Sequence, residues 1–298
     1  MMEGADLHET GARVSGAVDR LFAHHLGDTG DGRDRLFAAM RHAGIGGGKR
    51  LRPLLTVAAA RLFGMDEERA IRAGAAVEAI HVYSLIHDDL PCMDDDDLRR
   101  GKPTVHKLFD EATAVLAGDC FHDLAFEMLS DVATHEDPFV RAELVLELAR
   151  ASGPHGMAGG QMLDLAAEGA TLDLGAISRL QRLKTGALIE YAVEAACIMG
   201  RLQPQARTPY RGYARDIGLA FQIADDLLDH AGNEAAAGKR LHKDAAAGKA
   251  TFVSLMGEQR ARQQCAILVA QAIEHLGHHG TEADLLRAIA LFVEQRDR

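Results

Sequence analysis

The chain has 298 residues, of which 47% are hydrophobic and only 7 are proline, and its formal net charge is −11. The negative charge argues against nucleic acid as a partner, because phosphate backbones need a basic footprint. The apolar runs are interrupted too often to span a bilayer. No linker, fixed-period repeat or low-complexity tract divides the sequence, so we expect one domain over residues 1–298.

The N-terminus and the cysteines indicate the cellular compartment of the protein. The N-terminus lacks a basic region followed by an apolar core, so we expect no secretion signal. The cysteines stand singly, with no C-x-x-C pair, at Cys92, Cys120, Cys197 and Cys265. Isolated cysteines are typical of reduced thiols rather than of a disulfide framework or a zinc site. We therefore expect a cytoplasmic protein.

Hydrophobic residues repeat with a helical period along most of the chain, and no segment alternates long enough to predict a strand. The expected helices cover Arg52–Phe63, Glu67–Asp89, Ala112–Ala133, Pro138–Ala151, Leu174–Met199, Pro209–Asp229, Ala250–His275 and Thr281–Gln295. Small residues crowd the middle of several helices and would let them approach closely. The sequence predicts an all-α fold, a single large helical bundle with a deep central cavity among facing helices.

A glycine-rich turn at residues 46–48 leads through Lys49 and Arg50 into the first of these helices. Free backbone N–H groups, a helix N-terminus and neighbouring cations indicate an anion site. The turn is not a Walker A loop, because Arg50 stands where Ser or Thr is required and no strand precedes it. For this segment alone, a flexible basic loop is the alternative.

An acidic cluster closes the helix expected at Glu67–Asp89. Pro91 removes a backbone donor and disfavours the helical region for the residue before it. The helix should therefore loosen after Asp88 and Asp89 and bring Asp94 back beside Asp88. The roles of the next three acids stay open, since they could cap the following segment or pair with Arg99 and Arg100; they are Asp95, Asp96 and Asp97.

A second acidic cluster lies on the helix expected at Pro209–Asp229. Its polar members fall within one ~100° sector of an otherwise apolar helix; they are Gln222, Asp225, Asp226 and Asp229. A solvated acidic face is the alternative, but the apolar neighbours leave little polar surface. Buried carboxylates need a partner, so a cation between the two clusters is indicated. Oxygen ligands favour magnesium, which keeps coordination sites open for substrate phosphates.

Basic residues near both clusters could hold such phosphates. Arg99 and Arg100 can bind diphosphate oxygens bidentately or can neutralise the neighbouring aspartates. Lys184-Thr185-Gly186 interrupts a helix with a donor pair, and Lys239 and Lys249 follow the second cluster. Each signal is weak alone, but together they supply enough positive charge for two diphosphates.

These motifs give the chain a family resemblance. It resembles the trans-isoprenyl diphosphate synthases, most closely the bacterial short-chain members. The matching segments appear in order over almost the whole chain: GGGKRLRP at 46–53, SLIHDDLPCMDDDDLRRGKPT at 84–104, LAGD at 116–119, GMAGGQMLD at 156–164, LKTGALI at 183–189, FQIADDLLD at 221–229 and GKATF at 248–252. Two complete aspartate-rich motifs together with a GGKRLRP-type segment form a highly specific combination.

The resemblance implies a homodimeric prenyltransferase with three magnesium ions per active site. Its substrates would be isopentenyl diphosphate and the allylic dimethylallyl and geranyl diphosphates, and its product farnesyl diphosphate, with geranylgeranyl diphosphate as the alternative product. Magnesium would be held by Asp88, Asp89, Asp94, Asp225 and Asp229, with Asp226 in support. Of these, the residues expected to act in catalysis, together with Lys184, are Asp88, Asp89, Asp94 and Asp225.

The resemblance also implies two sets of substrate contacts. The allylic substrate would contact Arg99, Lys184, Thr185, Gln222, Lys239 and Lys249, and isopentenyl diphosphate would contact Lys49, Arg52, His81 and Arg100. Tyr83 and Ser84 would limit the length of the product. Helical geometry puts Ser84 within ~40° of Asp88 but Tyr83 ~140° round the axis, so Tyr83 can act only if the cavity extends to that side.

Three other classes of protein remain as alternatives. A terpene cyclase would share the first motif, but it should lack GGGKRLRP and normally carries a different second metal motif. A metal-dependent phosphohydrolase would need a set of histidine ligands that the 15 histidines do not form. A non-catalytic regulatory subunit would be expected to lose part of one aspartate motif, and here both are complete.

Overall fold

The computed structural model of the protein describes residues 2–167, 172–231 and 251–295. Its elements, in chain order, are α1 (Met2–His25), α2 (Asp34–Gly44), α3 (Leu51–Arg61), α4 (Glu67–Asp88), β1 (Leu98–Arg99), β2 (Lys102–Pro103), α5 (Val105–Leu108), α6 (Glu111–Ser130), α7 (Pro138–Ser152), α8 (Met157–Ala166), α9 (Leu174–Gln181), η1 (Arg182–Gly186), α10 (Ala187–Met199), η2 (Pro204–Arg207), α11 (Thr208–Ala231), α14 (Phe252–Met256), α15 (Glu258–His275), η3 (Thr281–Ala283) and α16 (Asp284–Gln295). The fold is all-α, as the sequence predicts, apart from the short antiparallel pair β1–β2.

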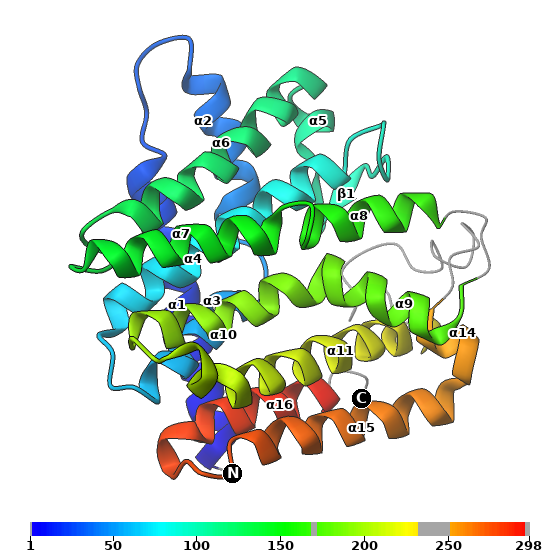
Figure 1. The fold of residues 1–298 in the computed structure, drawn as a ribbon. Coiled ribbons are helices and arrows are strands. Elements are labelled where there is room, and N and C mark those ends of the chain that lie inside the picture. Colours follow the sequence, from blue (N-terminus) through cyan, green and yellow to red (C-terminus); the bar gives the residue numbers. More distant parts are fainter. Residues whose placement is uncertain (1, 168–171, 232–250, 296–298) are drawn as a thin grey trace.

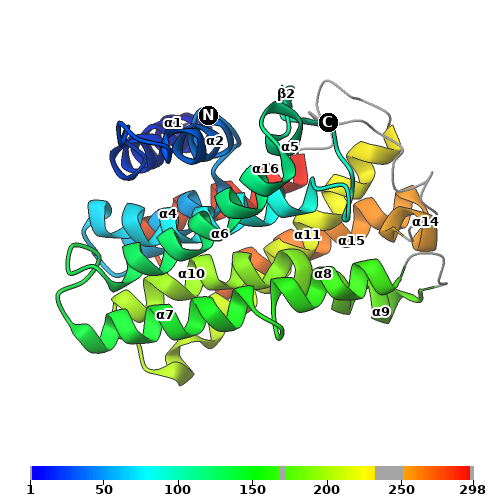
Figure 2. The same cartoon turned by 90° about the horizontal axis from the view of Figure 1, so that it is seen from above.

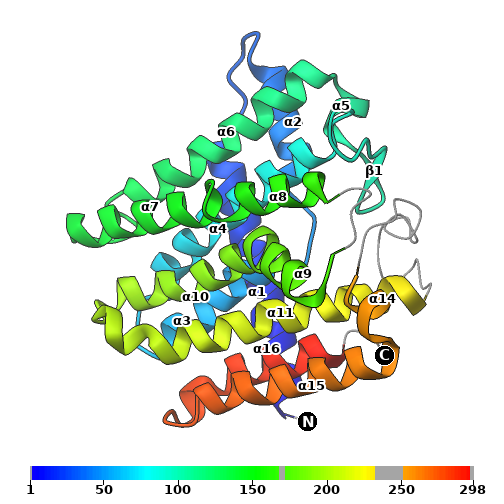
Figure 3. The same cartoon turned by 45° about the vertical axis from the view of Figure 1, so that its right-hand side comes forward.

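The helices pack in layers (Figure 1). Helix α4 packs between α3 and α6, and α10 contacts α3, α7 and α11. Helix α11 in turn packs on α15, which packs on α16 (Figure 3). Helices α7 and α8 follow one another along one side of the bundle (Figure 2). Helix α10 contacts both α4 and α11, so it lies between the two helices that carry the aspartate clusters.

One hydrophobic core joins these layers, from Val14 on α1 to Val293 on α16. Its centre is rich in small residues, as expected from the sequence. A Cβ atom on Gly74 would lie only 2.8 Å from the Cα atom of Pro53. Glycine at this position therefore lets α4 approach the first turn of α3 closely.

The expected helices are largely confirmed, with ends that shift by one to three residues. The sequence pattern missed α1, α2, α8 and the four-residue α5. In α1 and α8, glycines such as Gly16, Gly159 and Gly160 weaken the helical signal because glycine is a poor helix former. Packing against neighbouring helices stabilises them instead.

Two predicted helices differ from the observed ones. The segment Leu174–Met199 is interrupted by the π-helical turn η1, at the position where the sequence shows Lys184-Thr185-Gly186. The continuous helix expected over Ala250–His275 is wrong, because α14 and α15 are separated at Gly257, whose φ of 83° ends α14. Residues 232–250 lie outside the described part of the chain.

All four cysteines are free thiols, as predicted. Cys197 and Cys265 are buried, and burial raises the pKa of Cys197 to about 12 and that of Cys265 to about 11. None of the described helices combines the length and the hydropathy needed to cross a bilayer.

Candidate active site

The end of α4 has the backbone conformation that Pro91 predicts. The helix stops at Asp88, and the chain then turns back on itself. The Asp94 N–H donates to the Asp88 carbonyl at 2.9 Å, and the Asp96 N–H donates to the Asp89 carbonyl at 3.2 Å. The turn therefore brings the backbone of Asp94 beside that of Asp88.

Asp88 occupies an unfavourable position for an isolated carboxylate. Burial raises its pKa to about 6; Lys184 opposes this rise and Asp94 adds to it. The carboxylate therefore lies within electrostatic range of a lysine from η1 and of the second acid of its own loop. A bound cation would offset the cost of burying this charge.

Asp89 has a different environment from Asp88. Its side chain is only 5% exposed. The guanidinium of Arg99 donates to it through Nε at 3.0 Å and through Nη2, and Arg99 Nη2 also lies 3.3 Å from Asp96. Lys107 pairs with Asp97 at 2.9 Å. Arg99 thus neutralises neighbouring aspartates, which was one of the two roles left open for it.

The π-helical turn η1 presents Lys184 and Thr185. Lys184 Nζ donates to the Asp164 carboxylate of α8 at 2.7 Å. A Cβ atom on Gly160 would lie 2.2 Å from the Lys184 backbone nitrogen, so glycine there allows α8 to pack directly on η1. Turns of this type often occur at functional sites. Asp164 was not predicted as a site residue, although it ends the GMAGGQMLD segment.

The second acidic cluster on α11 is a regular helical surface. Thr185 Oγ1 donates to Gln222 Oε1 at 3.4 Å, and Gln222 Nε2 donates to Asp226 at 3.0 Å. The other oxygen of the buried Asp226 carboxylate accepts from the Phe252 N–H at 2.8 Å. Asp226 therefore anchors the start of α14, whereas Asp225 and Asp229 are partly exposed on the same helix.

These contacts connect the two clusters. Asp88 lies within electrostatic range of Lys184, and Thr185 next to it is hydrogen-bonded to Gln222 of α11. On the other side, Asp225 acts electrostatically on Arg52 at the start of α3. The acids of α4 and α11 are thus connected through residues of η1, and Asp225 lies within electrostatic range of α3.

Three predicted contacts for isopentenyl diphosphate form a basic group. Burial lowers the pKa of Arg52, with Glu78 opposing the shift and Arg100 adding to it. Burial and the nearby arginines, Arg52 first, lower the pKa of His81 well below its usual range, so the ring is neutral at pH 7. The Nε atom of Arg52 is buried without a hydrogen-bond partner among the described residues. Such a group suits an anionic ligand.

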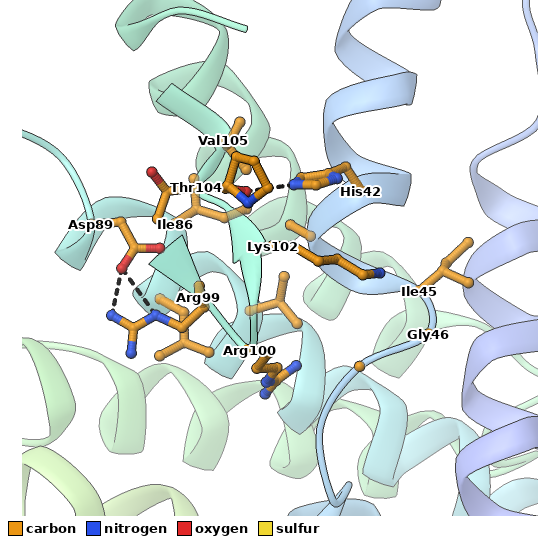
Figure 4. A pocket seen from close by; sticks show the side chains of 15 residues that line it. His42, Ile45, Gly46, Ile86, Asp89, Arg99, Arg100, Lys102, Thr104 and Val105 are labelled. Atoms are coloured by element: carbon orange, nitrogen blue, oxygen red, sulfur yellow. Dashed lines mark hydrogen bonds and ion pairs between the residues drawn. The ribbon is translucent and has the colours of Figure 1, made fainter. Parts of the chain in front are cut away.

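A pocket of about 540 Å³, including its open mouth, adjoins this basic group (Figure 4). It is bordered by the end of α2, Gly46 and Gly47, the β1–β2 pair and one face of α4. The labelled Asp89–Arg99 pair lies at its edge, and the side chains of Arg100 and Lys102 also border it. Asp88 and Asp225 do not line this pocket. Of the two acidic clusters, only the first borders this pocket, through Asp89, and Gly46 and Gly47 of the glycine-rich turn border it as well.

The predicted chain-length residues occupy different environments. Tyr83 is half-buried, and its ring packs edge-on against His87 of α4 and His122 of α6, with centroids 5.3 and 5.4 Å away. Burial raises its pKa, and Asp88 contributes to the rise. The Ser84 hydroxyl donates to the His81 carbonyl at 2.9 Å. Tyr83 thus lies between α4 and α6, near Asp88.

Three lysines were also predicted to contact the substrates. Lys49 is exposed and lies over the Phe292 ring at 5.8 Å. Lys239 and Lys249 lie outside the described residues.

Over the parts that the structure describes, no three His, Cys, Asp or Glu side chains are gathered to hold a metal ion.

Comparison with known proteins assigns the chain to a protein family. A model of the polyprenyl synthetase family matches residues 33–290. The chain belongs to the polyprenyl synthetase family, and it is a trans-prenyltransferase. This result leaves no place for the phosphohydrolase alternative.

Individual relatives are similar over most of their length. The chain is 45% identical over 264 residues to the farnesyl diphosphate synthase of Escherichia coli, covering 87% of this chain and 88% of that protein. It is also 45% identical over 265 residues to geranylgeranyl pyrophosphate synthase 11 of Arabidopsis thaliana, covering 87% and 74%. An apo crystal structure of an FPP/GFPP synthase from Zymomonas mobilis is 56% identical, with a TM-score of 0.90 and coverage of 97% and 99%.

Proposed function

We propose that the protein condenses isopentenyl diphosphate with dimethylallyl and geranyl diphosphates to give farnesyl diphosphate. The observation that carries the proposal is the position of Asp88. Its carboxylate is partly buried and lies within electrostatic range of Lys184, and the adjacent Thr185 is hydrogen-bonded to Gln222 on the helix that bears Asp225. A site with opposed acids and separate basic groups suits an allylic diphosphate on one side and isopentenyl diphosphate on the other.

The donor set fits magnesium. All of the proposed ligands are carboxylate oxygens, and because burial raises the pKa of Asp88, a bound cation would stabilise its ionised form. Three ions would be held by Asp88 and Asp94 on one side and by Asp225 and Asp229 on the other. Asp89 was predicted as a fifth ligand, but its ion pair with Arg99 favours a supporting role. Bound magnesium would stabilise the charge that develops on the departing diphosphate.

The side chains of the protein orient both substrates. Lys184 and Gln222 would contact the allylic diphosphate, with Thr185 held toward Gln222. Isopentenyl diphosphate would be held by Lys49, Arg52, His81 and Arg100. Its double bond then attacks the allylic carbon as the carbon–oxygen bond breaks. The proton lost at the end of the condensation can pass to the departing diphosphate, so no protein nucleophile is needed. Lys239 and Lys249 belong to the same proposal by motif position.

Product length is the second part of the proposal. The ring of Tyr83 lies near Asp88, where it would stop a growing chain at the farnesyl stage. Geranylgeranyl diphosphate is the alternative product, supported by the relative of that name in Arabidopsis thaliana. Incubation of the purified protein with isopentenyl diphosphate, each allylic primer and magnesium tests both parts, with the product measured by mass spectrometry. Phosphate release without condensation would contradict the proposal.

The proposal includes a homodimer in the cytoplasm. Several apolar side chains are exposed on α5 and α6, namely Leu108, Val115 and Leu116. Exposed apolar side chains that gather in one patch are typical of an interaction site, and these three residues lie on two helices that pack together. Sedimentation equilibrium should give twice the chain mass, and a Leu116→Glu variant should shift the protein toward the monomer. The four free thiols agree with a reducing compartment.

A further inference from the structure

Asp19, in the C-terminal half of α1, binds the first residue of the glycine-rich turn, Gly46, and also Arg50, which follows the turn. Its Oδ2 atom accepts a hydrogen bond from the Gly46 N–H at 3.1 Å. Its Oδ1 atom accepts one from Arg50 Nη2 at 2.7 Å. A single carboxylate therefore fixes two points of the turn that are four residues apart in sequence. Only a quarter of the Asp19 side chain is exposed, so solvent screens these contacts incompletely.

Arg50 needs such support because its backbone is strained. Its φ of 47° is in the left-handed region, which is unfavourable for residues with a Cβ atom. The guanidinium is fully buried and also binds Glu78 at 2.9 Å and the Gly44 carbonyl. It lies over the Phe22 ring of α1, 5.8 Å from its centroid. Contacts from α1, α2 and α4 thus hold one strained residue in place.

The strained residue separates two cations with a different role. Lys49 precedes Arg50, and Arg52 follows it by two residues at the start of α3. Asp19 and Glu78 pair with the guanidinium of Arg50, so Arg50 anchors this segment to the fold while Lys49 and Arg52 flank it. The direction of both side chains depends on the backbone between Gly46 and Arg52. A shift of this backbone would move Lys49 and Arg52 together.

We propose that Asp19 is a positioning residue for isopentenyl diphosphate, which holds the glycine-rich turn and Arg50 so that Lys49 and Arg52 face the diphosphate. The inference rests on the proposed function. It extends the site to α1, because Asp19 and Phe22 precede residue 33, where the match to the family begins. In this proposal the N-terminal helix α1 helps to position the residues that bind isopentenyl diphosphate.

Two variants separate the contacts that Asp19 makes. In Asp19→Asn the amide oxygen can still accept from the Gly46 N–H, but the charge opposite Arg50 is lost. In Asp19→Ala both contacts are lost. We expect the KM for isopentenyl diphosphate to rise roughly tenfold in Asp19→Ala and by less in Asp19→Asn, because small displacements of binding groups weaken ligand contacts. The KM for geranyl diphosphate and the kcat at saturation should stay near the wild-type values.

Asp6→Asn is the matched control on the same helix. Asp6 accepts from Thr10 at 3.0 Å and lies 3.5 Å from Arg61, with no contact to the turn. The control should leave all kinetic constants unchanged. Melting temperatures of the three variants show whether an effect comes from general destabilisation. If the KM for both substrates and the kcat change together with the melting temperature, Asp19 has only a structural role and the inference is wrong.

Calorimetric titration of metal-free protein with isopentenyl diphosphate gives a second readout that does not depend on turnover. Binding should weaken in Asp19→Ala and stay unchanged in Asp6→Asn. A wild-type protein that binds and condenses isopentenyl diphosphate, with an Asp19→Ala variant equal to it in both assays, contradicts the positioning role alone. A wild-type protein that catalyses no condensation contradicts the proposed function itself.

Discussion

The two aspartate pairs, Asp88-Asp89 on α4 and Asp225-Asp226 on α11, have the same sequence but different surroundings. On α4 the helix ends within the pair, and Asp89 is buried against the arginine of the β1–β2 hairpin. On α11 the helix continues through the pair, and Asp226 is buried against the Phe252 N–H and the Gln222 amide. In both pairs, the second carboxylate stabilises the structure around the site.

This difference shows how the two halves of the candidate site are stabilised, where the first half is the region around Asp88-Asp89 and the second half is the region around Asp225-Asp226. The first half depends on an ion pair with Arg99, so its shape is set by long, charged side chains of a short hairpin. The second half depends on backbone and amide donors, which have fixed directions. We therefore expect the first half to be more sensitive to charge changes, and the second to be more sensitive to changes that move α14.

The largest effect should come from the first member of each pair. Asp88→Asn or Asp225→Asn keeps the shape of the side chain but removes its charge. We expect the rate of condensation to fall by roughly 10³-fold or more, because stabilisation of the leaving group dominates such catalysis. Steady-state assays measure the rate, and circular dichroism should show an unchanged helical content. Wild-type condensation activity in either variant would exclude these residues as metal ligands.

The second members should have smaller effects that differ between the halves. In Asp89→Asn the guanidinium of Arg99 loses its buried partner, and in Asp226→Asn one oxygen that accepts a hydrogen bond is replaced by a donor. Each should lower kcat/KM by roughly 10- to 100-fold, because supporting residues of a metal site usually act on this scale.

Arg99→Lys serves as a test of the first half. Lysine keeps the charge but cannot bind a carboxylate bidentately. The loss in Asp89→Asn should therefore be reproduced in part by Arg99→Lys, whereas Asp226→Asn should be independent of the Arg99 substitution in a double-mutant cycle. Strong coupling between Asp226 and Arg99 would contradict the separation of the two halves.

The pH dependence should follow from the burial of Asp88. Its pKa is raised to about 6, so the carboxyl group is protonated below that pH and ionised above it. Only the ionised form binds a cation. The apparent affinity for magnesium should fall as the pH is lowered through about 6, by up to about tenfold for each further pH unit. Magnesium titrations at several pH values measure the effect, and in Asp88→Asn the pH dependence should be weaker.

The smallest effect on rate should come from Tyr83, which lies beside the first half only. Tyr83→Ala removes the ring that packs against His87 and His122. We expect products longer than farnesyl diphosphate at a rate within about tenfold of the wild type, because the substitution opens space without touching the reacting groups. Mass spectrometry of the products from each primer is the measurement. Ser84→Ala is the control on the adjacent residue, and an unchanged product in Tyr83→Ala would reject Tyr83 as the limit.

Much of the fold and the site was predictable from local sequence. Pro91 predicts the end of α4 and the return of Asp94, and helical spacing predicts the polar surface from Gln222 to Asp229. The break near Lys184 was also visible, but its π-helical form was not, because it depends on packing against Gly160 of α8. The positions of α1 and Asp19 could not be predicted, since no local pattern connects residue 19 to residues 46–50.

The sequence by itself determined the class of fold, the family and the identity of the acidic and basic residues, because helical periodicity and short motifs are local properties. Only the tertiary structure decided which member of each aspartate pair is anchored to other parts of the fold. That choice depends on partners that are distant in the chain, such as Phe252 for Asp226, or on how the chain turns after α4, as with Arg99 for Asp89. A carboxylate is directed by the donors that surround it after folding, and its neighbours in sequence do not specify them.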